Sequence, residues 1–266
     1  METKVIPIRY IWAASYCGMT LIKGEKNILI DTAFQESVSP FLEEELKKEA
    51  LSLKDIDLIY NTHSHSDHVE GNFLISESSG ASVYIHPAGK NAPHVKELNE
   101  KVKTFSDGEK IASTRIFFTP GHSPDSVVIL EENTSTLIIG DSIEGNGSGF
   151  AAVALIHDPP AYLESIKKVR DLYQAGRVKR IIFSHMTDGF GDEVYGEEIE
   201  KFLDASENTC HKYIVFTKAL LEKEPECTVE RAGALLRENF AVTEKIISPG
   251  AANGVARAFL EYCRKN

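Results

Sequence analysis

The strongest constraint on the fold is a short segment with four potential metal ligands, Thr62-His63-Ser64-His65-Ser66-Asp67-His68. It directly follows residues 56–61, an apolar run with the length of a buried strand. Imidazole and carboxylate groups bind zinc, iron and similar divalent ions. In an extended segment His63 and His65 point to the same side, whereas Asp67 and His68 come from the following turn. Two histidines can therefore hold one ion, while the aspartate and the third histidine hold a neighbouring ion.

A site for two ions needs further ligands, and three candidates occur elsewhere in the chain. His122, Asp141 and His185 each follow directly on an apolar run that predicts a strand. Loops at strand ends are where folded scaffolds commonly carry functional residues. One such histidine alone would be an ordinary loop residue, but together these residues complete a set of seven ligands.

Short apolar runs bounded by turn residues predict strands over most of the first 190 residues. They lie at 5–12, 19–22, 27–31, 56–61, 82–86, 114–119, 126–131, 135–139 and 179–184. Helices are expected at 40–49, a segment rich in charged residues, and at 160–175, where apolar residues recur every three positions. Strands mixed with helices in this way predict a layered α/β fold with sheets inside and helices outside.

The pattern becomes helical after about residue 194. We expect helices at 196–222, at 228–239 with Thr228 as N-cap, and from Ser248-Pro249 onward. The prediction is a catalytic domain over residues 1–194 and a C-terminal helical extension over residues 195–266. The extension could cover the site or form a homodimer contact.

Composition narrows the choice of partners and compartment. The chain has 29 basic and 40 acidic residues and a net charge of −11, which argues against nucleic acid as a partner. No apolar window approaches the roughly 20 residues that span a bilayer, so no membrane association is expected. Lys4 and Arg9 interrupt the N-terminal apolar stretch, which does not resemble an export signal. The four cysteines are scattered without a C-x-x-C pair, as expected for idle thiols in the cytoplasm.

The series His-x-His-x-Asp-His, Gly-His, Gly-Asp and a strand-end His resembles the metallo-β-lactamase fold superfamily over roughly residues 5–190. This resemblance implies an αβ/βα four-layer sandwich of two mixed sheets with outer helices. It also implies that Asp31, after an early strand, orients a metal ligand by hydrogen bonding. The implied ligands are His63, His65 and His122 for a first ion and Asp67, His68 and His185 for a second, with Asp141 bridging both.

Two ions in such a site can share a hydroxide, because metal binding lowers the pKa of water from about 15.7 towards about 7. The hydroxide would attack a carbonyl or phosphoryl centre. Asp67 can accept a proton or orient the nucleophile as well as bind metal, so it is the predicted catalytic residue. We expect two divalent ions, zinc in the first place and iron or manganese as alternatives.

Within the family, the chain is most similar to the glyoxalase II-like and lactonase-like branches. The expected reaction is therefore hydrolysis of an ester, thioester or lactone in a small molecule. Val69-Glu70-Gly71-Asn72 follows the first motif, where glyoxalase II-like sequences usually have Gly-Gly, so a glutathione thioester is not implied. The alternatives are a phosphodiesterase, a mononuclear-iron oxygenase similar to persulfide dioxygenases, and a catalytically idle metal-binding sensor.

Four residues near the expected site are candidates for substrate contacts. Trp12 and Tyr16 belong to the segment from Trp12 to Met19, which is expected to be a loop beside the metals. His157 and Tyr162 follow Asp141 in the chain. Each could instead be a packing residue.

Overall fold

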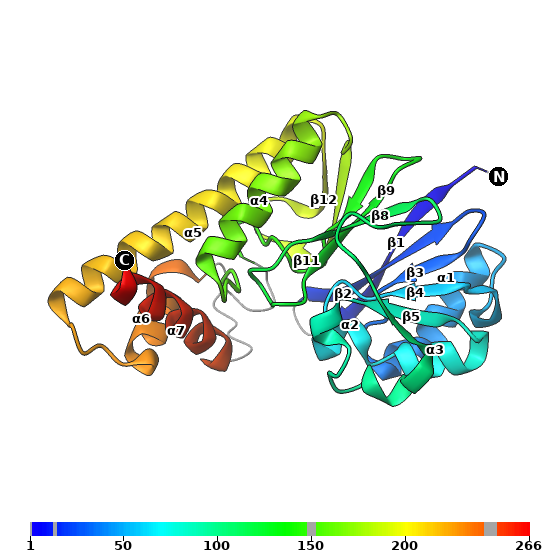
Figure 1. Ribbon diagram of the computed structural model, residues 1–266, viewed down its shortest axis with the longest axis horizontal. Helices are drawn as coiled ribbons and strands as arrows, with labels where there is room; N and C mark the ends of the chain where they lie inside the picture. Colours follow the sequence, from blue (N-terminus) through cyan, green and yellow to red (C-terminus); the bar gives the residue numbers. More distant parts are fainter. Residues whose placement is uncertain (1, 13–14, 148–152, 242–248) are drawn as a thin grey trace.

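The computed structural model describes residues 2–12, 15–147, 153–241 and 249–266. Within these residues, two six-stranded mixed sheets pack face to face (Figure 1). The first sheet has the spatial order β1 (Lys4–Trp12), β2 (Ser15–Lys23), β3 (Ile28–Ile30), β4 (Leu58–Tyr60), β5 (Ser82–Ile85) and β6 (Val102–Thr104). The second has the order β12 (Gly191–Tyr195), β11 (Arg180–Thr187), β10 (Thr136–Ile138), β9 (Val127–Glu131), β8 (Thr114–Phe118) and β7 (Lys110–Ile111).

Helices cover the outer face of each sheet. The helices are α1 (Glu43–Lys48), α2 (Ser66–Val69), α3 (Asn72–Ser79), α4 (Pro159–Gln174), α5 (Glu197–Lys223), α6 (Val229–Phe240) and α7 (Pro249–Lys265). Short 3-10 helices occur at Gln35–Ser37, Leu53–Asp55, Pro87–Gly89 and Lys96–Lys101, and a π-helical turn at Val38–Leu42. Helices α1 and α3 lie against the first sheet, and α4 and α5 lie against the second (Figure 1). In the described part of the chain, no helix is long and apolar enough to cross a membrane.

Three hydrophobic clusters fill the spaces between the four layers. Val127 and Ile129 of β9 face the first sheet, and Val128 and Leu130 of the same strand face the outer helices. This alternation follows from the period of two along a strand. The cluster beneath α4 and α5 also includes Phe259 of α7, so it contains residues from both sides of the predicted boundary at residue 194. The sandwich architecture predicted from the sequence is therefore confirmed, with apolar packing on both faces of both sheets.

Side-chain caps account for the starts of helices α4 and α6. The Asp158 side chain accepts a hydrogen bond from Ala161 N at the start of α4, and the Thr228 side chain accepts one from Arg231 N at the start of α6. These side chains satisfy backbone N–H groups that the first helical turn leaves without partners. Thr228 is thus confirmed as an N-cap, whereas Ser248, the predicted cap of the last helix, lies outside the described residues.

Two features of the sheets differ from the sequence-based expectation. The segment from Trp12 to Met19 was expected to be a loop, but β2 begins at Ser15 and pairs with β1. A Cβ atom at Gly18 would lie 2.9 Å from the Ser184 backbone, so glycine permits β2 to pass close to β11. Strands β6, β7 and β12 were not expected. They are short, contain several polar residues, and are defined by pairing with a neighbour more than by apolar content.

Candidate metal centre

The predicted ligands come from strands whose carboxyl ends meet at one edge of the sandwich. Strands β3 and β4 are parallel, as are β10 and β11. Strand β8 is parallel to β10, because both pair antiparallel with β9. The loops after β4, β8 and β10 carry the histidine motif, His122 and Asp141, and His185 lies near the end of β11. The topology therefore gathers residues that are far apart in the sequence.

A glycine permits the two sheets to approach each other at this edge. Gly140 has a φ of +54°, and a Cβ atom there would clash with the side chain of Thr62. Only glycine adopts this backbone conformation without cost and also leaves room for Thr62. Asp141 is consequently placed beside the histidine motif of the opposite sheet.

The first predicted group, His63, His65 and His122, is brought together by the fold. His65 Nδ1 lies 3.0 Å from His63 Nε2 and 3.1 Å from His122 Nε2. Burial lowers the pKa of His63 well below its usual value, and the neighbouring imidazoles act in the same direction. Burial and the adjacent His122 lower the pKa of His65 to about 4. His63 and His65 are therefore neutral imidazoles near pH 7, the form that binds metal.

The second predicted group consists of imidazoles and carboxylates in close pairs. His185 Nε2 lies 3.2 Å from Asp67 Oδ2, and Asp141 Oδ2 lies 3.4 Å from both His185 Nε2 and His68 Nε2. Asp141 Oδ2 is also 3.8 Å from His122 Nε2, so this carboxylate stands between the two groups.

The charges of the second group support one another. Burial by itself would lower the pKa of His68 and of His185, but the nearby Asp141 and Asp67 carboxylates hold both well above their usual value. Burial would conversely raise the pKa of Asp67, yet His68 and His185 lower it to about 2. The same two imidazoles hold the pKa of Asp141 well below its usual range. Both aspartates are therefore ionised at neutral pH and available as anionic ligands.

Hydrogen bonds at Nδ1 fix the orientation of the second group's histidines. Asp31 Oδ2 lies 2.8 Å from His68 Nδ1, and its two oxygens also accept bonds from Thr62 N and Thr62 Oγ1. His185 Nδ1 lies 2.7 Å from the backbone oxygen of Tyr16, to which it can donate. A partner at Nδ1 directs Nε2 of each ring towards the cluster.

The donor set fits divalent ions. His65 Nδ1 can take part in only one hydrogen bond at a time, yet two histidine nitrogens face it at hydrogen-bond distance. His68 Nε2 is buried and makes no hydrogen bond of normal geometry within the described residues, although Asp141 Oδ2 lies 3.4 Å away. Nitrogen and carboxylate ligands that converge in this way match the preferences of zinc and of iron or manganese.

The predicted substrate contacts occupy varied environments. Trp12 packs on Phe34, with 5.0 Å between ring centroids, and the Tyr16 ring lies 5.8 Å from the guanidinium carbon of Arg9. Tyr162 is fully buried, and its hydroxyl accepts a hydrogen bond from Glu144 N. Contact of these residues with a substrate stays a prediction.

His157 is exposed and lies beside the first group. Its Nδ1 donates to the backbone oxygen of His122 at 2.7 Å. A Cβ atom at Gly254 of α7 would be 2.9 Å from His157 Nε2, so the ring also packs against the C-terminal helices. Its contact with a substrate likewise stays a prediction.

Two residues near the ligands were missed by sequence reasoning. Cys17 was expected to be idle, but its sulfur lies within 4.8 Å of ligand atoms of Asp67 and His185. Glu144 was not singled out, although it is a carboxylate in a buried segment only three residues after Asp141. Burial would lower the pKa of His122, but the Glu144 carboxylate beside its Nδ1 and the charge of Asp141 raise it above its usual value.

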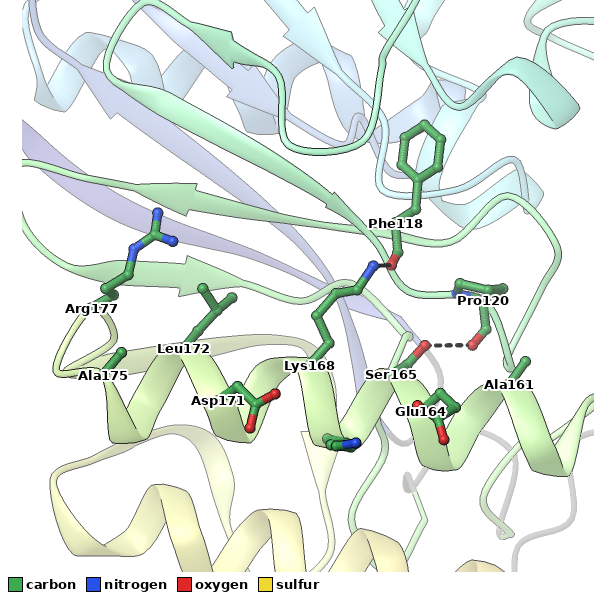
Figure 2. A pocket seen from close by; sticks show the side chains of 11 residues that line it. Phe118, Pro120, Ala161, Glu164, Ser165, Lys168, Asp171, Leu172, Ala175 and Arg177 are labelled. Atoms are coloured by element: carbon green, nitrogen blue, oxygen red, sulfur yellow. Dashed lines mark hydrogen bonds between the residues drawn. The ribbon is translucent and has the colours of Figure 1, made fainter.

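A separate groove of about 590 Å³ lies between α4 and the segment after β8 (Figure 2). Dashed lines in Figure 2 mark two hydrogen bonds, in which Lys168 Nζ donates to Phe118 O and Ser165 Oγ donates to Pro120 O. Both have a length of 2.7 Å. These bonds attach the segment that leads to His122 to helix α4. The two bonds thus help to hold the loop of His122 in place. The side chains that line the groove include both basic and acidic residues.

Comparisons with known proteins agree with this geometry. The chain matches the family model described as the metallo-beta-lactamase superfamily over residues 14–185. It is 35% identical over 147 residues to a probable metallo-hydrolase of Methanocaldococcus jannaschii, and the match covers 48% of this chain and 68% of that protein. It is 31% identical over 161 residues to the mitochondrial hydroxyacylglutathione hydrolase of Saccharomyces cerevisiae, a match that covers 56% of this chain and 53% of that protein. The chain therefore spans about half the length of the yeast enzyme.

One solved structure resembles the whole chain. A metallo-beta-lactamase family protein from Thermus thermophilus has a TM-score of 0.72, covering 99% of this chain and 93% of that one. Its sequence identity is 19%, so the likeness concerns the fold alone.

Proposed function

This chain belongs to the metallo-beta-lactamase superfamily, and on that premise we propose that it is a binuclear metal-dependent hydrolase of a small-molecule ester, thioester or lactone. One observation carries the proposal. Seven potential ligands, which come from four separate segments of the chain, converge in two groups with Asp141 between them. The similarity to a hydroxyacylglutathione hydrolase and to a probable metallo-hydrolase supports hydrolysis as the reaction class.

The side chains at this edge have distinct tasks in such a reaction. When bound, two divalent ions would lower the pKa of water and stabilise negative charge on a carbonyl oxygen. Asp67, with a pKa of about 2, remains an anion that binds metal and accepts a hydrogen bond from a water molecule. Asp31 and the Tyr16 carbonyl keep His68 and His185 in orientation. His65 is the exposed member of the first group, so a substrate can approach from its side.

The charge of the site fits an electron-rich or anionic substrate despite the acidic composition. Two divalent ions would bring about four positive charges. The carboxylates of Asp67, Asp141 and Asp31, with Glu144 beside His122, would be offset by this charge. The net charge of −11 is therefore an average that does not describe the site.

The first test combines a substrate panel with elemental analysis of the protein as purified. We expect about two divalent ions per chain and hydrolysis of at least one ester, thioester or lactone. A single iron with oxygen uptake would instead identify a mononuclear oxygenase, and cleavage of phosphodiesters alone would identify a phosphodiesterase. A metal-loaded protein without activity on all four bond types would favour a sensor.

The second test replaces Asp67 by Ala. Because Asp67 is both a predicted ligand and a predicted catalytic residue, hydrolysis should fall by about 100-fold or more. Asp204→Ala is the matched control, since Asp204 is exposed and pairs with Arg170, which keeps Glu200 and Glu207 as partners. Full activity of Asp67→Ala with two bound ions would contradict the proposed role.

A further inference from the structure

Glu144 is a buried carboxylate that the sequence motif does not require. It lies three residues after Asp141, and only 6% of its surface is exposed. No Lys or Arg side chain of the described residues forms an ion pair with it, and the cationic group that it faces is the imidazole of His122. A buried carboxylate is costly unless it is paired and hydrogen bonded, so its place beside a predicted ligand needs an explanation.

The geometry places Glu144 behind His122 relative to the other ligands. Glu144 Oε1 lies 3.0 Å from His122 Nδ1, whereas His65 Nδ1 and Asp141 Oδ2 lie on the Nε2 side of the same ring, at 3.1 Å and 3.8 Å. His122 Nδ1 donates its hydrogen bond to Leu155 O at 3.1 Å, and Glu144 Oε1, which makes no hydrogen bond of its own within the described residues, lies beside it at ion-pair distance. Two acceptors therefore face Nδ1, which favours the tautomer with its proton on Nδ1 and a free electron pair on Nε2.

Hydrogen bonds hold both the Glu144 carboxylate and the backbone of its segment. Leu155 N donates to Glu144 Oε2 at 3.1 Å, and Glu144 N donates to the Tyr162 hydroxyl of α4 at 3.1 Å. The next residue, Gly145, donates its N–H to Ser206 Oγ of α5, also at 3.1 Å. One bond thus holds the carboxylate itself and two hold the backbone of its segment, one of these to the C-terminal helices.

We propose that Glu144 is a positioning residue for metal binding, which holds His122 through Nδ1 and strengthens its Nε2 as a ligand of the three-histidine group. The proposal rests on the proposed metal centre but not on the reaction that it performs. Each group would then have one histidine with a carboxylate next to its Nδ1: Asp31 lies beside His68 in the second group, and Glu144 lies beside His122 in the first. A carboxylate held beside the Nδ1–H of a ligating imidazole makes that imidazole more basic.

The test measures metal binding without any substrate. Full-length protein, stripped of metal, is titrated with zinc against a chelating dye to obtain two dissociation constants. Glu144→Gln keeps the shape of the side chain and removes its charge. We expect one constant to weaken about 10–100-fold and the other to stay unchanged. Asp31→Asn should weaken the other constant in the same experiment.

Glu131→Gln is the matched control. Glu131 is fully buried and accepts hydrogen bonds from Asn133 N and Thr134 N, in a turn outside the site. This variant should lower the stability of the fold and leave both zinc constants unchanged. Wild-type constants in Glu144→Gln, or an equal weakening in Glu131→Gln, would overturn the proposal.

A measurement on the wild-type protein keeps the proposal testable if Glu144→Gln does not fold. In zinc-loaded protein, nitrogen-15 NMR should show a proton on His122 Nδ1 that exchanges slowly with solvent. An Nδ1 without a proton would overturn the proposal. Wild-type protein that binds two ions but hydrolyses no ester, thioester or lactone would count against the proposed function and leave the role of Glu144 standing.

Discussion

Replacement of Asp31 by Asn should weaken metal binding at the group that contains His68 while the backbone stays in place. Asp31 has a φ of +58°, in the left-handed region, which Asn tolerates as readily as Asp. Asp31 Oδ1 accepts from Thr62 N at 2.8 Å, and Asn keeps an oxygen for this bond. Asp31 Oδ2 lies 2.8 Å from both Thr62 Oγ1 and His68 Nδ1, and in Asn an NH₂ group takes its place.

The new amide group cannot accept a proton from His68. It can donate to the Thr62 hydroxyl once that group turns, but His68 Nδ1 must then lose its proton. The proton moves to Nε2, the nitrogen that faces Asp141 and that a metal would use. Loss of such a supporting carboxylate typically weakens metal binding about 10–100-fold, equivalent to about 1.4–2.7 kcal/mol. Loss of a charged hydrogen bond should also lower the free energy of unfolding of the metal-free protein by about 1.5–3 kcal/mol.

Zinc titration against a chelating dye measures the first effect, and urea unfolding of metal-free protein measures the second. Asp57→Asn is the matched control, because Asp57 accepts from Asn27 N at 2.8 Å at a surface position outside the site. It should leave both zinc constants as they are in the wild type. If Asp31→Asn also binds zinc as tightly as the wild type, the reasoning about the His68 tautomer is refuted.

Three further predictions concern stability. Removal of bound metal by a chelator should lower the unfolding temperature. When the free metal concentration is about 1,000 times the dissociation constant, each bound ion contributes about 4 kcal/mol to the free energy of unfolding. An unchanged unfolding temperature would contradict metal binding at this site. Hydrogen bonds from Lys110 and Arg115 lower the pKa of Glu132 from 4.5 to about 2. Because the pKa of Glu132 is lower in the folded than in the unfolded protein, the ionised side chain stabilises the fold at pH values above the unfolded-state pKa. Glu132→Gln should therefore lower the free energy of unfolding by about 1 kcal/mol at pH 7, measured by denaturant unfolding. This difference should shrink below pH 4.5 and vanish near pH 2, and a difference constant with pH would count against it. Tyr213→Phe should cost about 1–3 kcal/mol, because the buried N–H of Ala154 loses its acceptor; an unchanged urea midpoint would show that another acceptor replaces it.

The central strands of the sandwich could be predicted because their signal is local. Residues 126–131 and 179–184 are apolar runs, and the structure has β9 at Val127–Glu131 and β11 at Arg180–Thr187. The edge strands β7 and β12 lack such a signal, because each has a neighbouring strand on one side only among the described residues and their side chains are partly polar. Their pairing is set by neighbours already in place, which no local pattern records.

In the candidate site, the ligands could likewise be predicted from the sequence, whereas the groups that hold them in orientation could not. The motif from His63 to His68 lies within one segment, so its residue types and spacing indicate metal binding without a structure. The support behind each histidine depends on distant parts of the chain. His185 Nδ1 meets the backbone oxygen of Tyr16, which is 169 positions away in the sequence. A backbone carbonyl has no residue type, so no motif could reveal this partner.

The sequence by itself determined the fold class and the set of candidate ligands, because apolar periodicity and closely spaced imidazoles and carboxylates are local properties of the chain. Only the tertiary structure decided which carboxylate stands behind which imidazole. Asp31 reaches His68 because β3 lies beside β4, and Glu144 reaches His122 because α4 and α5 hold the loop after β10. Such contacts follow from the packing of two sheets against each other and of helices against the sheets. They depend on the whole hydrophobic core and not on any single segment.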